Sequence, residues 1–216
     1  MKSFPDATTV EAFLEASRHA GTVLASNEVR LAWARPSAVE MMTVGDICGH
    51  MFLIVRRVGK RLEDSGRVSE QAPAAKPVGW TWMRVQTAAD LDLPEQSQVR
   101  MDGAHVAAWG WEDVHRAYDD RTRRVEGLLQ RGLPAAMDVG GHSLSFSAYL
   151  ATRVVELIVH SDDLACSVGL VNAPPALALT TAVDALVDGS RSVHGDLTVL
   201  RALSRRERAL DGISVF

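Results

Sequence analysis

Apolar residues at helical spacing are the feature of this sequence that most limits its fold. In residues 8–31 the apolar side chains recur three and four positions apart, which places them on one face of an amphipathic helix. Later segments repeat this pattern and end at glycine, proline or a loss of periodicity. The sequence therefore predicts an all-α fold. The expected helices are 8–31, 43–65, 111–131, 145–168, 176–187 and 197–203.

Four long helices are predicted before residue 170, and the connections between them vary in length. This arrangement predicts a four-helix bundle. Pro174 and Pro175 then interrupt the chain. We therefore expect residues 1–170 to form the bundle. Residues 171–216 should form a short helical C-terminal extension that packs on it.

Residues 66–108, between the second and third bundle helices, show no sustained period. Residues 78–85 and 99–107 could form short strands, although their alternation is poor. A segment of about 40 residues without regular structure is uncommon in a compact domain. We therefore expect an irregular segment with short local elements, packed through the tryptophans in and beside it.

Composition excludes several classes of function. The chain has 23 basic and 27 acidic residues, a net charge of −4, whereas nucleic-acid binders usually carry a basic surplus or stripe. No apolar run of about 18 residues is present, so no membrane span is expected, and the first residues do not resemble a signal peptide. The two cysteines, Cys48 and Cys166, are expected to be small core residues in a reducing compartment, which points to the cytoplasm.

Three of the seven histidines follow an acidic residue by four positions, which puts both side chains on one helix face. The pairs are Glu15–His19, Asp46–His50 and Glu156–His160. An isolated pair of this kind is usually a solvated ion pair that supports the helix. We interpret Glu15–His19 as such a surface ion pair. Glu156–His160 has apolar residues on both sides, and a buried charge needs a partner or a metal.

His50 lies in a strongly apolar helix, where it is either a hydrogen-bonded core residue or a ligand. Asp46 could hold its second ring nitrogen, could serve the helix N-terminus in a capping-box-like pair with Thr43, or could do both. With Glu156 and His160, His50 would complete a set of two imidazoles and one carboxylate. Three protein ligands leave coordination positions open, as in catalytic zinc sites, and the same set suits ferrous iron.

Segments that contain these residues resemble the mycothiol-dependent maleylpyruvate isomerase family of the DinB-like superfamily. The run TVGDICGHM, which ends one residue after His50, is similar to the second-helix signature of that family. The run YLATRVVELIVHSDDLACSVGL resembles its Arg-x-x-Glu-x-x-x-His-x-x-Asp-Leu segment, and VLRALSRRERALDGISVF is similar to its C-terminal segment. The resemblance covers most of the chain with gaps and is weakest over residues 66–108. The matching positions in the second run are Arg153, Glu156, His160, Asp163 and Leu164.

The resemblance implies a DinB-like bundle that binds a divalent metal through His50, Glu156 and His160. Zinc is the expected metal, with iron and nickel as alternatives. Asp46 and Asp163 are expected to support the ligands. The family also implies mycothiol, or a similar low-molecular-weight thiol, that ligates the metal as thiolate. Metal coordination lowers the pKa of a thiol and yields a nucleophile at neutral pH.

The activity expected from this resemblance is isomerisation or S-transfer on a small electrophile. The isomerase itself has a further α/β domain that supplies a catalytic arginine, and about 45 residues follow residue 170 here, so we expect a substrate other than maleylpyruvate. Arg153, Arg201 and Arg205 are candidate anion contacts or structural ion pairs. We expect a monomer or homodimer whose partners are a small thiol and an electrophile.

Two other functions are compatible with the sequence. A DinB-like bundle could bind metal without catalysis, or act as a regulatory protein. The run GGHSLS, with Ser143 at its centre, is similar to the nucleophile elbow of serine hydrolases, but an elbow follows a buried strand, and the preceding AAMDV is short and contains an acid. Ser143 or Ser145 is expected instead to cap the helix that follows.

Overall fold

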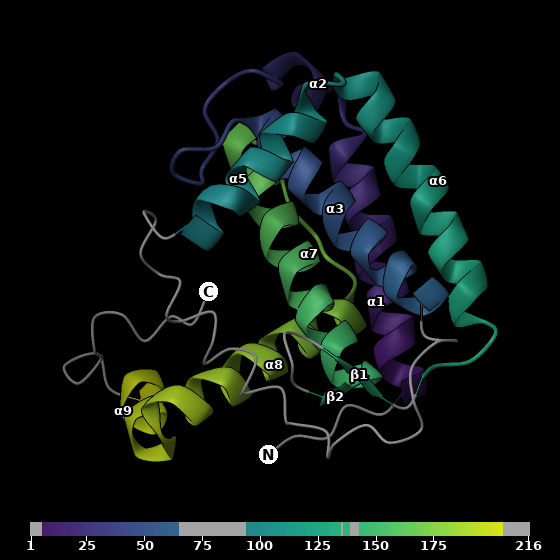
Figure 1. The fold of residues 1–216 in the computed structure, drawn as a ribbon. Coiled ribbons are helices and arrows are strands. Elements are labelled where there is room, and N and C mark those ends of the chain that lie inside the picture. The colour runs from purple at the N-terminus through teal and green to yellow at the C-terminus, as the bar shows by residue number, and fades with distance from the viewer. Residues whose placement is uncertain (1–5, 65–93, 135, 139–142, 205–216) are drawn as a thin grey trace.

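The computed structural model confirms an all-α fold. It describes residues 6–64, 94–134, 136–138 and 143–204, which contain eight helices and one short hairpin (Figure 1). Among these residues, no helix is long and apolar enough to cross a membrane.

Four long helices lie side by side as the predicted bundle (Figure 1). They are α1 (Asp6–Leu24), α3 (Val44–Asp64), α6 (Trp111–Leu129) and α7 (Phe146–Val168). Helix α3 packs against α6 and α7, and α1 packs against α6 and α7. The contact between α3 and α7 determines the site described below, because it joins two segments that are far apart in the sequence.

The apolar periodicity of the sequence corresponds to the buried faces of the helices. On α3 the residues spaced three and four apart are all buried, and the long apolar side chains of α7 are buried as well. Removal of these side chains from water is the main driving force that holds the bundle together. The buried α3 residues of this stripe are Ile47, Met51, Ile54, Val58 and Leu62.

The ends of the helices follow the capping signals of the sequence. The backbone N–H of Thr43 donates to Asp46 Oδ2 at 2.8 Å, and the N–H of Asp46 donates to Thr43 Oγ1 at 3.2 Å, which is the predicted capping box of α3. Ser145 caps α7, since its hydroxyl accepts from the N–H of Ala148 at 3.2 Å. Gly169 ends α7 in the left-handed conformation, with φ of 74°.

The first predicted helix is divided in two, so the single helix expected over 8–31 is wrong. Helix α1 ends at Leu24, and α2 (Asn27–Ala32) follows. Ser26 separates them, because its hydroxyl accepts a hydrogen bond from the N–H of Val29 at 3.3 Å and so caps a new helix. Serine competes for backbone hydrogen bonds in this way, and apolar spacing does not reveal it.

Residues 99–107, considered above as a possible short strand, are helical, because α5 (Pro94–Ala107) covers them. Among residues 97–107, whose burial the structure describes, only Gly103 and Val106 are buried, so apolar periodicity is weak there. Instead, the backbone of α5 lies directly against the backbone of α3, at the point where Gly49 faces Gly103. Residues 78–85, the other expected strand, lie outside the described residues. Trp109, just after α5, packs on Phe52 with ring centroids 5.6 Å apart, which agrees with tryptophan-mediated packing.

The chain after α7 continues in α8 (Ala176–His194) and α9 (Asp196–Ser204). Helix α8 is longer than the predicted 176–187; it packs on α7 and α1, and α9 contacts α8. The division into a bundle and an extension stays a prediction. A short antiparallel hairpin, β1 (Ala136–Asp138) with β2 (Ser143–Ser145), precedes α7 and was not predicted.

We expect Gly49→Ala to destabilise the protein, because a Cβ at this position would collide with the backbone carbonyl oxygen of Gly103. Overpacking of this kind costs about 1–3 kcal/mol in the free energy of unfolding, measured by urea denaturation. Gly127→Ala is the matched control: it lies in α6 with open space around it, so it should stabilise the protein by up to about 1 kcal/mol. An unchanged urea midpoint for Gly49→Ala would contradict the close α3–α5 contact.

Candidate metal centre

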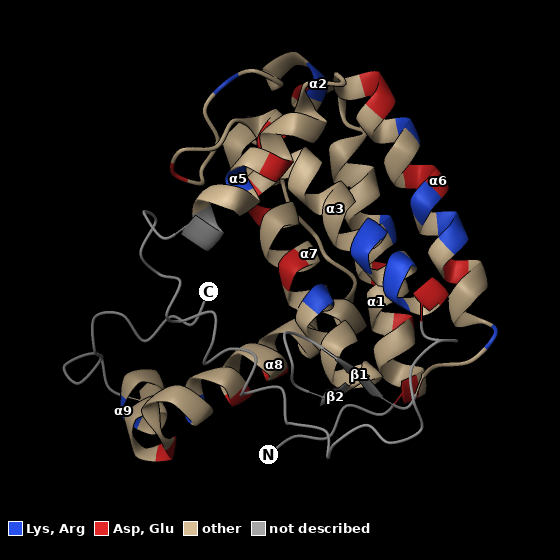
Figure 2. Ribbon diagram, viewed as in Figure 1, with Lys and Arg blue, Asp and Glu red and all other residues tan. Residues whose placement is uncertain are grey.

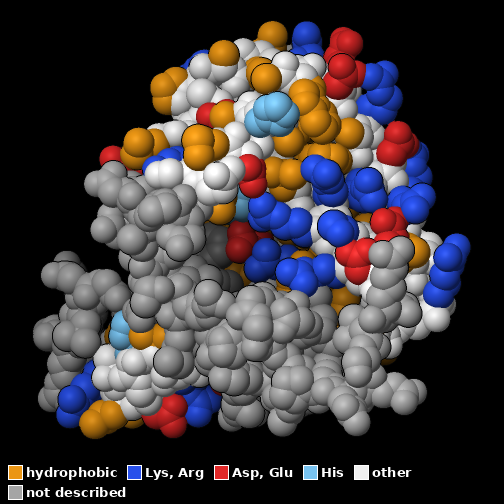
Figure 3. Space-filling model, in the orientation of Figure 1, with side chains coloured by type: hydrophobic (Ala, Val, Ile, Leu, Met, Phe, Trp, Pro, Cys, Tyr) orange, Lys and Arg blue, Asp and Glu red, His pale blue; other side chains and the backbone are white. Residues whose placement is uncertain are grey.

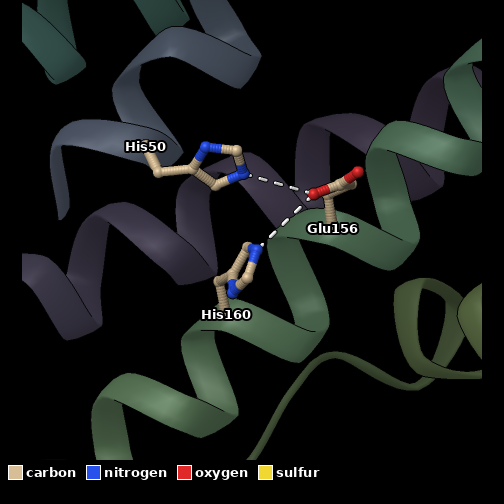
Figure 4. A group of neighbouring side chains, drawn as sticks. All are labelled: His50, Glu156 and His160. Carbon is tan, nitrogen blue, oxygen red and sulfur yellow. Dashed lines mark hydrogen bonds and ion pairs between the residues drawn. The ribbon is translucent and has the colours of Figure 1, made fainter. Parts of the chain in front are cut away.

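The three predicted ligands come together where α3 crosses α7 (Figure 4). His50 lies on α3, and Glu156 and His160 lie one turn apart on α7. Glu156 Oε2 is 3.3 Å from His50 Nε2 and 3.5 Å from His160 Nε2. One ligand atom from each residue lies within 4.8 Å of the other two. Two imidazole nitrogens and one carboxylate oxygen therefore converge on one point.

These side chains are largely shielded from water. The exposed fractions are 8% for the side chain of His50, 16% for Glu156 and 12% for His160. His50 is shielded because it projects from the apolar face of α3. A charge shielded to this degree must be compensated by nearby groups.

Glu156 is held in its ionised form. Burial acts to raise its pKa, but the Arg153 guanidinium and the hydrogen bonds to the two histidines outweigh burial and keep the pKa well below its usual value. The Arg153 guanidinium lies 3.5 Å from Glu156 Oε1. A negative charge is thus present in the cluster at neutral pH.

The two histidines differ in charge. Burial lowers the pKa of His50, so its ring is neutral at pH 7 and retains a lone pair. Burial also acts to lower the pKa of His160, but hydrogen bonds to Asp163 and Glu156 outweigh it and raise the pKa to about 9. Asp163 Oδ2 lies 3.0 Å from His160 Nδ1, so it holds the ring with Nε2 toward Glu156.

Asp46 does not support His50, contrary to one of the two roles considered for it. Its carboxylate accepts from the N–H of Thr43, and its function is therefore that of a helix cap. His50 Nδ1 is buried and has no hydrogen-bond partner among the described residues.

Arg153 is engaged inside the site rather than free at the surface. Its guanidinium lies 5.3 Å from the centroid of the Tyr149 ring, and its Nε donates to Thr152 Oγ1 at 3.0 Å. Tyr149 was not identified as a site residue from the sequence. The signal that could have revealed it is an aromatic residue four positions before an arginine on the same helix face.

The surroundings of the site are basic. Figure 2 shows basic segments of α3 next to α7, and Figure 3 shows lysine and arginine side chains gathered beside a recess in which acidic and histidine side chains are visible. Arg57 of α3 pairs with Asp102 of α5 at 3.3 Å and lies close enough to lower the pKa of His50.

The donor set fits a divalent metal. Histidine nitrogens and a carboxylate oxygen are the ligands of zinc and ferrous iron, and three of them converge here from well-packed helices. The His50 and His160 rings meet edge to face, with centroids 4.9 Å apart, so their nitrogens approach Glu156 from two directions. Among the residues that the structure describes, no other group of three histidine, cysteine or acidic residues is placed to hold a metal.

The remaining sequence candidates have other roles. Glu15 and His19 do not form the predicted surface ion pair: Glu15 Oε2 accepts from the N–H of Ala178 at 3.3 Å, and His19 Nε2 bonds Asn172 Oδ1 at 2.7 Å. The Glu15 and His19 side chains therefore link α1 to the segment that follows α7 by hydrogen bonds. Cys48 is buried as expected, but Cys166 is exposed, so its assignment to the core is wrong.

The serine-hydrolase interpretation gains no support from the fold. Ser143 lies in the three-residue strand β2, and its side chain lies outside the described part of the chain. Ser145 is the helix cap that the sequence predicted.

Models of known protein families and the curated proteins give no match to this chain. Two solved structures are similar to it. One is the mycothiol-dependent maleylpyruvate isomerase, with a TM-score of 0.55 and 14% identity. The other is a histidine-to-alanine mutant of that isomerase, with a TM-score of 0.56 and 13% identity. Each comparison covers 84% of this chain and 70% of the other. The likeness shows that this chain shares the DinB-like helical fold of these structures; at 14% identity it shows the fold alone.

Proposed function

We propose that this protein is a metal-dependent isomerase or S-transferase, in which the thiolate of a low-molecular-weight thiol adds to a small electrophile. The observation that carries the proposal is the convergence of His50 Nε2 and His160 Nε2 on Glu156 Oε2. The structural neighbour, which is mycothiol-dependent by name, supports it. Mycothiol or a similar thiol is therefore the proposed cofactor, with zinc, iron or nickel as the metal.

Each residue of the site would have a distinct role. His50, Glu156 and His160 would hold the metal, and three protein donors leave coordination positions for other ligands. When bound, the metal would lower the pKa of a coordinated thiol and so supply a nucleophile at neutral pH. Asp163 holds the ring of His160 in the orientation that ligation needs.

Domain boundaries, partners, oligomeric state and compartment are also proposed. We place the site in a bundle of residues 1–170, with 171–216 as an extension. The proposed partners are a small thiol and an electrophilic substrate rather than nucleic acid or membrane, and the protein would act as a monomer or homodimer. The proposed compartment is the cytoplasm, in agreement with two cysteines that are both free.

A non-catalytic role is the second candidate. It is favoured by the fact that the Glu156 carboxylate already pairs with His50, His160 and Arg153 through hydrogen bonds and ion pairs. In this role the cluster would bind metal for stability or regulation, or would hold α3 to α7 without metal. Metal content and thiol ligation separate the two candidates.

The proposed site should hold metal in the purified protein. Protein purified without chelator should contain about one equivalent of a divalent metal by plasma mass spectrometry, and His50→Ala or His160→Ala should lose it, because two donors hold a metal far more weakly than three. His115→Ala is the control, since His115 pairs with Asp119 on α6 at 3.5 Å and is not one of the three converging residues. A wild-type protein that stays free of metal even after reconstitution would exclude the enzymatic function.

The affinity for metal should depend on pH. His160 must lose a proton to ligate, and its pKa is about 9, whereas His50 is already neutral. The zinc association constant should therefore rise by about tenfold per pH unit between about pH 7 and 8.5. Calorimetry in buffers of different ionisation enthalpy should detect release of about one proton. In Asp163→Asn the pKa of His160 falls, so fewer protons should be released; equal release in both proteins would refute this assignment.

A low-molecular-weight thiol should bind to the metal. Cobalt(II)-loaded protein should gain a near-ultraviolet sulfur-to-metal absorption band when mycothiol is added, with glutathione and cysteine tested in parallel. Glu156→Gln, which keeps the shape of the side chain but weakens ligation, should show no band. Absence of a band with every thiol in metal-loaded wild-type protein would favour the non-catalytic role.

A further inference from the structure

The two oxygens of the Glu156 carboxylate have different partners. Oε2 faces both imidazoles, at 3.3 Å from His50 Nε2 and 3.5 Å from His160 Nε2. Oε1 lies 3.5 Å from the guanidinium of Arg153. One oxygen is thus directed to the point where the ligand atoms converge, and the other is occupied by a positive charge.

Arg153 is itself held in place. Only 16% of its side chain is exposed, so solvent screens its ion pair with Glu156 weakly. Its guanidinium stacks over the Tyr149 ring at 5.3 Å, and Tyr149 is buried with its ring centroid 5.9 Å from that of Phe146. A guanidinium fixed on an aromatic ring is preorganised to pair with a carboxylate.

The spacing of these residues puts them on one face of α7. Successive members are three, four, three, four and three positions apart, which is the interval between neighbours on a helix surface. Each ligand of α7 therefore has a neighbour that engages the atom directed away from the convergence point: Arg153 for Glu156 Oε1, and Asp163 for His160 Nδ1. The residues of this face are Phe146, Tyr149, Arg153, Glu156, His160 and Asp163.

We propose that Arg153 is a positioning residue that restricts Glu156 to ligation through a single oxygen. Carboxylates can bind a metal through one oxygen or two. A second oxygen from Glu156 would fill a coordination position that the proposed function needs for the thiol or the substrate. The proposal rests on the metal site of the proposed function, and it assigns Arg153 a role inside the site that differs from contact with an anionic substrate.

The test compares zinc coordination in four proteins by zinc K-edge X-ray absorption. Wild-type protein should show two imidazole nitrogens and one carboxylate oxygen from the protein at about 2.0–2.2 Å. Arg153→Gln should gain one carboxylate oxygen, because Glu156 Oε1 is released. Arg153→Lys should keep the wild-type coordination, since an ammonium can still pair with that oxygen.

Arg61→Gln is the matched control. Arg61 stacks on the same Tyr149 ring at 5.5 Å, but it belongs to α3 and lies outside the α7 face. Its loss should leave zinc coordination unchanged. Cobalt(II)-loaded samples give a second readout, because visible absorption bands weaken as the number of donors increases; only Arg153→Gln should show weaker bands.

Several outcomes would overturn the proposal. Equal coordination in wild type and Arg153→Gln, or two Glu156 oxygens already bound in wild type, would each do so. Circular dichroism shows whether Arg153→Gln folds. If it does not, Arg153→Lys supplies the test, and a change in zinc coordination in that variant would refute the proposal. Failure of the proposed function is seen separately, as a wild-type protein that takes up no zinc.

Discussion

The buried carboxylate of Glu156 is the constraint on which the rest of this site depends. An ionised group so shielded from water is stable only if nearby groups compensate its charge. In this chain the compensation comes from two helices: Arg153 and His160 on α7, and His50 on α3. The packing of α3 on α7 therefore has an electrostatic part as well as an apolar one. Removal of any of these partners would leave Glu156 with fewer groups to offset its burial.

The bundle was predictable from the sequence because its helices bury continuous apolar stripes and begin or end at recognisable caps, such as Thr43 with Asp46, Ser145 and Gly169. Helix α5 was not predictable from periodicity, since it meets α3 by backbone at Gly49 and Gly103 rather than by an apolar face. Proline is favoured in the first turn of a helix, so Pro94 was the signal that could have indicated where α5 begins.

The candidate site was predictable in its chemistry but only partly in its contacts. Three acid–histidine pairs had the same spacing, and apolar context singled out Glu156–His160. Spacing could not show that Asp46 caps a helix or that Glu15 and His19 bind the chain after α7. It also could not show which oxygen of Glu156 faces the histidines, because that depends on side-chain rotamers of two helices.

The positions of the three ligands in the sequence also determine the order in which the cluster assembles during folding. Glu156 and His160 are one turn apart, so they become neighbours as soon as α7 is helical, whereas His50 is 106 residues from Glu156 in the sequence. Contacts between residues so far apart require closure of a long loop and form slowly. A partly folded chain with a helical α7 would therefore present two of the three ligands, and arrival of His50 would mark completion of the tertiary fold.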